Sequence, residues 1–303
     1  MAGGGDSTRA ILFALGANFA IAIAKGVAAF VTGSSAMLAE TVHSLAESGN
    51  QLLLLLGLKQ AKKPPSPDYP LGYGKEIYFW SFLVAVMLFT IGGMYSLYEG
   101  LHKLAHPEPL EKWPWAVGVL VFSIAMEGYS THACLKEAAA ERAGRSLWRW
   151  FRESRSAELI VVVGENIAAL LGLGVALLFI GLSIITGDPV WDAVGTLLIG
   201  VLLVVVAVFV AIEVKAMLVG QSIDPRRQAE MMAFVGERPE IDTVYNMITL
   251  QLGTRSMVSV QARLHRDVGS AAQIDAIERD FRVAFPEVMW SFFEPEDKGD
   301  LEA

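Results

Sequence analysis

Cysteine, charge and basic residues are all scarce in this sequence of 303 residues. Its single cysteine, Cys134, excludes an internal disulfide framework and any cluster of thiolate metal ligands. A bound metal ion would therefore be held by imidazole, carboxylate or amide groups. Lys and Arg number 24 against 32 Asp and Glu, a formal net charge of −8, so the basic patches typical of nucleic-acid binding are not expected. We predict no nucleic-acid partner.

Hydrophobic residues, by contrast, make up 53% of the chain, and charged residues only 18%. A chain this apolar does not remain disordered in water. Its apolar runs are also too long to be buried together in one soluble core of this size. The sequence therefore predicts an integral membrane protein that contacts the lipid bilayer directly.

Six segments are long and apolar enough for membrane-spanning helices, which need about 20 residues each. They are residues 10–32, 36–58, 77–101, 114–136, 158–185 and 190–219. The predicted fold is an α-helical membrane protein, with a flexible tail at residues 1–8 and a domain of six transmembrane helices at residues 9–220.

Lys and Arg concentrate in two of the predicted connections, residues 59–76 and 137–157. The positive-inside rule places these connections and both termini in the cytoplasm. A bacterial inner membrane fits a multi-pass protein of this kind, and an organelle membrane is the alternative.

The composition changes after Gly220, and residues 221–303 have the polarity of a soluble domain. Polar and apolar residues alternate from Met257 to His265, which is the pattern of a half-buried strand. Further strands are predicted at 242–252 and 287–293, and helices at 226–237 and 270–284. This order predicts a small cytoplasmic ferredoxin-like α+β domain.

The second span carries several polar side chains that are costly in a membrane. Glu40, His43, Glu47 and Asn50 fall within roughly 80° of one another on a helix. Ionisable groups at this depth cost about 2.5–3.5 kcal/mol each and tend to mark a transport pathway. His43 and Glu47 stand four residues apart, a spacing that suits half of a site for Zn²⁺ or a similar divalent cation.

The fifth span offers Glu165 and Asn166 as the other half of this site. They are adjacent and so point about 100° apart, which means that only one can face the second span squarely. We predict a metal site drawn from His43, Glu47, Glu165 and Asn166. The alternative is that these side chains only join helices to each other. Glu127 and Asp192 are secondary candidates for moving protons.

Several stretches together resemble the cation diffusion facilitator family, in particular its zinc-transporter-like branch that includes mitochondrial animal members. They are GSSAMLAETVHSLAESGNQLLLLLGLKQA, YPLGYGKEIYFWSFLVA, GGMYSLYEG, SIAMEGYS, VVVGENIAALLG and PEVMWSFFEP. The resemblance implies six transmembrane helices, a cytoplasmic ferredoxin-like domain, a homodimer, and exchange of a divalent cation, usually zinc, for protons. It also implies a transporter and not an enzyme, with the metal as cargo and no resident cofactor.

Position by position, the paired ligands of the family fall on His43 and Glu47, and its acidic position on the fifth helix falls on Asn166. The branch has Asp where this chain has Glu47 and Asn166, and a further ligand position of the wider family falls on Val162. The loss of an anion at Asn166 weakens zinc binding, favours another divalent ion such as manganese, iron, cobalt or cadmium, or transfers the ligand role to Glu165.

These residues predict a metal/proton antiporter that works by alternating access. Metal ligands must be deprotonated, so protons compete with the cation for the same groups, and histidine titrates near neutral pH. The main alternative is a membrane partner or chaperone subunit that no longer transports. A soluble di-iron bundle is a third, because Glu40-x-x-His43 and Glu99-x-x-His102 match the ligand spacing of such proteins.

Overall fold

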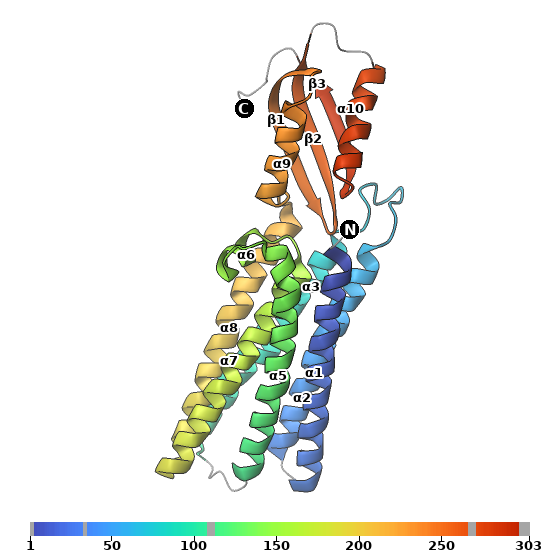
Figure 1. Cartoon of the computed structure of the whole chain (residues 1–303). Helices are drawn as coiled ribbons and strands as arrows, with labels where there is room; N and C mark the ends of the chain where they lie inside the picture. Colours follow the sequence, from blue (N-terminus) through green and yellow to red (C-terminus); the bar gives the residue numbers. More distant parts are fainter. Residues whose placement is uncertain (1–2, 33–34, 108–112, 266–270, 297–303) are drawn as a thin grey trace.

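The computed structural model describes residues 3–32, 35–107, 113–265 and 271–296, without the side chains of 3–7, 28–29, 31–32, 35–40 and 42–43. A bundle of long helices carries a small mixed α/β module at one end (Figure 1). The bundle and the module meet where the predicted change of composition occurs, just after Gly220.

The bundle consists of six long helical segments in the described part of the chain. They are α1 (Gly3–Thr32), α2 (Ser35–Ala61), the continuous run of α3 (Glu76–Met87), η1 (Leu88–Met94) and α4 (Tyr95–Ala105), α5 (Trp113–Arg142), α7 (Ala157–Thr186) and α8 (Val190–Val219). The middle of the third segment, η1, is a π-helix, a widened turn that is often found at functional sites. The short α6 (Leu147–Glu153) lies at the end of the bundle nearest the module (Figure 1).

Two details of the bundle differ from the sequence expectation. Four segments of the described chain are long and apolar enough to cross a membrane: Thr8–Val27, Glu76–Ala105, Ala157–Thr186 and Val190–Val219. The count of six spans is therefore not confirmed, because α2 and α5 are equally long but richer in polar residues. In addition, α1 begins at Gly3, so most of the expected flexible tail at residues 1–8 is helical. The apolar run fixes the buried part of a helix but not where its hydrogen bonding begins.

Glycines let α8 approach the third segment closely. A methyl group on Gly200 would lie 2.8 Å from the backbone nitrogen of Leu97, and one on Gly100 would lie 2.9 Å from that of Leu197. Small residues at such contacts allow helix backbones to pack by van der Waals forces, which drive helix association where both surroundings are apolar. Close packing at these glycines thus joins α4 to α8, in addition to the ion pair of 3.0 Å between Lys103 and Asp192.

The C-terminal module has the element order predicted from the sequence. It contains α9 (Pro225–Gly236), β1 (Ile241–Leu252), β2 (Arg255–Leu264), α10 (Ala271–Ala284) and β3 (Val288–Pro295). The strand order is β1-β2-β3, with β1 and β2 antiparallel and β2 and β3 parallel. Both helices pack on one face of the sheet around Met231, Val258 and Phe281, which are at most 4% exposed.

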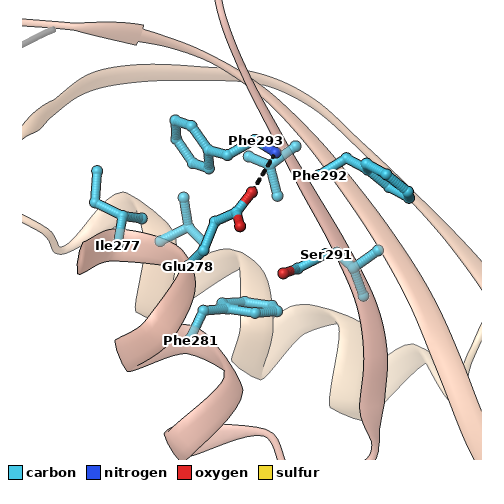
Figure 2. A pocket seen from close by; sticks show the side chains of 9 residues that line it. Ile277, Glu278, Phe281, Ser291, Phe292 and Phe293 are labelled. Carbon is cyan, nitrogen blue, oxygen red and sulfur yellow. Dashed lines mark hydrogen bonds between the residues drawn. The ribbon is translucent and has the colours of Figure 1, made fainter. Parts of the chain in front are cut away.

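A small cavity remains in this module between α10 and the sheet (Figure 2). The Glu278 carboxylate accepts a hydrogen bond of 3.2 Å from the backbone N–H of Phe293 at its rim. Glu278 and Ser291 are the only polar side chains among the residues that line it. The cavity is therefore part of the apolar core of the module.

Arginines join the module to the bundle. The Arg145 side chain is 2% exposed and forms ion pairs with Asp224 (2.7 Å) at the start of α9 and with Glu153 (3.3 Å) on α6. Arg155 donates from Nε to the carbonyl oxygen of Ser222 at 2.5 Å. On the other side, the backbone N–H of Gly253 in the β1–β2 turn donates to the Tyr78 hydroxyl of α3 at 2.9 Å.

The glycine packing of α8 gives a first testable expectation. We expect Gly200→Ala to lower the thermal unfolding temperature of the purified protein, because overpacking costs about 1–3 kcal/mol and exceeds the gain of about 0.5–1 kcal/mol in helix propensity. The matched control is Gly174→Ala in α7, where a methyl group meets nothing within 4 Å. Equal unfolding temperatures for the two variants in detergent would contradict close α4–α8 packing.

Candidate functional site

The polar face of α2 is turned into the bundle. Ser44, Ser48, Asn50 and Gln51 are all at most 6% exposed, although α2 is rich in polar residues. Glu47 on the same helix is half-buried. The side chains of Glu40 and His43 lie outside the described residues, so the predicted pairing of His43 with Glu47 stays a prediction. Of the predicted polar arc, the structure describes only the side chains of Glu47, which is half-buried, and Asn50, which is buried.

Glu165 on α7 contacts this face. Its Oε1 accepts a hydrogen bond of 2.7 Å from Asn50 Nδ2, and its Oε2 accepts one of 3.1 Å from Gln51 Nε2. Glu165 is 8% exposed. Asn18 on α1 completes the group by donating from Nδ2 to Gln51 Oε1 at 3.3 Å. A buried carboxylate is thus held between α2 and α7 by two amide groups that the sequence did not single out as its partners.

Asn166 points elsewhere. Its Nδ2 donates to Ser130 Oγ at 2.8 Å and contacts Cys134 Sγ at 3.3 Å, both on α5. Adjacent helical residues diverge by about 100°, so α7 directs Glu165 to α2 and Asn166 to α5. Of the two candidates on this helix, the structure brings Glu165 beside the predicted half-site and turns Asn166 away from it.

Further charged side chains surround the hydrogen-bonded group around Glu165. Glu127 on α5 is 3% exposed, and it lies within electrostatic range of Glu47 and of Lys25 on α1. The Glu165 carboxylate experiences the charges of both Glu47 and Glu127. Lys25 also donates from Nζ to Ser44 Oγ at 2.9 Å. The core of the bundle therefore contains three acidic side chains from three helices in one electrostatic neighbourhood.

Glu47 and Asn50 also line a small cavity between α2, the third segment and α8. The opposite wall includes Leu88 and Gly92 of the π-helix η1 and Leu203 of α8. Within the described residues, no three His, Cys, Asp or Glu side chains are close enough to hold a metal ion together. A cation at this place would therefore need amide oxygens or His43 in addition to carboxylates.

Of the two secondary candidates, Glu127 belongs to the buried acidic group described above, and Asp192 has an ion-pair partner. Asp192 forms an ion pair of 3.0 Å with Lys103, and Glu213 forms one of 2.7 Å with Arg152. His102 is exposed in the last turn of α4, and the side chains of Glu40 and His43 lie outside the described residues, so the alternative of a di-iron bundle stays a hypothesis. The other exposed histidines are His106, His132 and His265.

Comparison with known proteins identifies the scaffold. A family profile described as the cation efflux transmembrane domain matches residues 11–219. The mitochondrial proton-coupled zinc antiporter SLC30A9 of Homo sapiens is 32% identical over 231 residues, which are 76% of this chain and 41% of that protein. Metal tolerance protein C4 of Arabidopsis thaliana is 28% identical over 253 residues, or 82% of this chain and 55% of that protein.

A shorter match, 32% identical over 101 residues, is to the magnetosome protein MamB of Magnetospira sp. strain QH-2, and it covers 33% of this chain and 34% of that protein. The chain spans less than half the length of the animal antiporters. The family profile nevertheless covers the whole helical bundle, from α1 to the end of α8. The chain therefore belongs to the cation diffusion facilitator family of cation efflux proteins.

Proposed function

We propose that this protein is a divalent metal cation efflux transporter that exchanges zinc for protons, with manganese, iron, cobalt and cadmium as alternative cargoes. The observation that carries the proposal is the buried Glu165 carboxylate, bound by Asn50 and within electrostatic range of Glu47. A negative charge at this depth is costly unless a cation or a proton neutralises it. The animal relatives, which are named proton-coupled zinc antiporters, support the same conclusion.

The proposed cation ligands are His43 and Glu47 on α2 with one group from α7. Glu165 is favoured over Asn166 for that third position, because Glu165 contacts α2 whereas the Asn166 amide is bonded to Ser130 on α5. Imidazole and carboxylate are both common zinc ligands. The zinc ion is cargo, so the protein needs no resident cofactor and acts as a transporter rather than an enzyme.

Proton exchange follows from the same groups. A carboxylate or imidazole binds a metal only when deprotonated, so protons and the cation compete for the site. On the side of the membrane with more protons, the site releases its metal and takes up protons. On the other side it does the reverse, and alternating access connects the two states without a separate proton pathway.

We further propose six membrane crossings, with both termini and a ferredoxin-like module in the cytoplasm. The arginines that join the module to the bundle, among them Arg145 and Arg155, fit a cytoplasmic side under the positive-inside rule. The proposed assembly is a homodimer. The proposed membrane is a bacterial inner membrane, with an organelle membrane as the alternative that the mitochondrial relatives favour.

A second candidate function is that of a membrane partner or chaperone subunit that does not transport. It is favoured by Asn166, which stands where the resembling branch has an acidic ligand and is used for helix contacts with Ser130 and Cys134. Uptake by vesicles that contain the purified protein and a metal-sensitive dye distinguishes the two functions. Absence of uptake for all five metals, at any imposed pH gradient, would establish the second.

Removal of the proposed ligands should stop transport. We expect His43→Ala and Glu47→Ala to reduce zinc uptake into proteoliposomes to background, because each removes one of the few groups able to bind the cation in the bundle. Asp192→Asn is the matched control, since Asp192 is an acidic residue of a membrane helix that is paired with Lys103 instead. Wild-type uptake by His43→Ala would refute the site.

The choice between the two α7 residues is a separate measurement. We expect Glu165→Gln to weaken zinc binding by about tenfold or more, because a neutral amide replaces an anionic ligand of the cation. Asn166→Ser should change it by less than about threefold. Isothermal titration of the purified variants with zinc reports both affinities, and the opposite order would assign the ligand role to Asn166.

A further inference from the structure

We propose that Asn50 supplies a carbonyl oxygen ligand to the transported cation in the cavity between α2, η1 and α8, and that Glu165 orients its amide for this task. The inference rests on the proposed transport function, since it adds a ligand to the same site. It goes beyond that function because it assigns a cation-binding role to a neutral residue and places the cation beside the π-helix η1.

The first step is the orientation of the Asn50 amide. Asn50 donates from Nδ2 to Glu165 Oε1 at 2.7 Å, so the amide nitrogen is the atom that faces the carboxyl group. The carbonyl oxygen is on the opposite side of the same planar amide. Glu165 therefore fixes which atom of Asn50 is available for a ligand.

The second step concerns the burial and the hydrogen bonding of that carbonyl oxygen. Asn50 is 5% exposed, and its Oδ1 is buried with no hydrogen-bond partner among the described residues. A buried polar atom left unsatisfied costs about 1–3 kcal/mol, and folded proteins contain few of them. A cation near Oδ1 would remove this cost, because a carbonyl oxygen is a good ligand for hard divalent ions.

The third step is the cavity that Asn50 lines. The cavity has a volume of about 20 Å³, enough for one water molecule or one small ion. Glu47 and Asn50 are the only charged or amide side chains among the described residues that line it, and Met87, Leu88, Ile91 and Leu203 provide apolar walls. One carboxylate and one carbonyl in an otherwise apolar cavity are suited to a cation and not to an anion.

Gln51 provides an internal comparison. It also donates to Glu165, at 3.1 Å, and is 1% exposed. Its carbonyl oxygen, however, already accepts a hydrogen bond from Asn18 Nδ2, and Gln51 is not among the residues that line the cavity. Two neighbouring amides thus share the same carboxylate, but only the Asn50 amide has an oxygen available for a cation.

The proposed ligand has a consequence for metal preference. Carbonyl and carboxylate oxygens suit manganese, whereas imidazole suits zinc. We expect Asn50→Ala to weaken Mn²⁺ binding by about tenfold or more and Zn²⁺ binding by less, as measured by isothermal titration of the purified full-length protein with each metal. Gln51→Ala also removes a hydrogen bond to Glu165 but no oxygen at the cavity, so it should leave the ratio of the Mn²⁺ and Zn²⁺ affinities unchanged.

A second variant separates a ligand from a purely structural amide. Asn50→Asp keeps an oxygen at the cavity but loses the Nδ2 donor to Glu165. If Asn50 binds the cation, Asn50→Asp retains Mn²⁺ affinity at least equal to that of the unmodified protein. If the amide only joins α2 to α7, Asn50→Asp is as impaired as Asn50→Ala, which would overturn the proposal even where the alanine variant is poorly folded.

The same titrations distinguish failure of this inference from failure of the proposed function. Loss of binding in Glu47→Ala, together with an unchanged ratio of Mn²⁺ and Zn²⁺ affinities in both Asn50→Ala and Gln51→Ala, would overturn the role of Asn50 alone. Unchanged binding of both metals in Glu47→Ala and His43→Ala would overturn the transport site itself, and the Asn50 inference with it.

Discussion

The structure depends on one constraint, which is that a carboxylate buried in the helical bundle must have polar partners. Glu165 obtains them from Asn50 and Gln51, and Gln51 is in turn bound by Asn18. A buried charge without such partners would lower the free energy of unfolding by on the order of several kcal/mol. This requirement explains why α2 is the polar helix of the bundle and why α1, α2 and α7 are held at one depth. The polarity that lowers the hydropathy of α2 is what stabilises the core.

The C-terminal module is linked to the same region through α3. The Tyr78 hydroxyl near the start of α3 binds the β1–β2 turn at Gly253, and Met87 at the end of α3 lines the cavity beside Glu47. One rigid helix therefore runs from the module to the cavity. On the other side, Arg145 links α9 to α6 through Asp224 and Glu153. The module is therefore attached to the bundle at two places, the β1–β2 turn and the start of α9.

Much of this arrangement follows from sequence alone. Apolar length predicted the long helices, and alternation predicted the order of elements in the module, because both patterns are local. The rotation of α7 against its neighbours depends on distant contacts, so local patterns could not decide that Glu165 meets α2 while Asn166 meets α5. The π-helix η1 was also missed, and Gly92 and Gly93 within it were the only signal. The role of Asn50 could have been suspected, since it shares the polar arc of α2 with Glu47.

The neutral side chain of Asn166 is explained by the helix that it faces. Glu127, Ser130 and Cys134 stand at intervals of three and four residues on α5, so they share one face, and Asn166 bonds to the latter two. An Asp at this position, as in the resembling branch, would bring a second carboxylate to the face that already carries Glu127. Like charges in a buried site repel strongly. An amide instead donates to both neighbours, so in this chain α5 contributes the acidic group of that face and α7 contributes the donor.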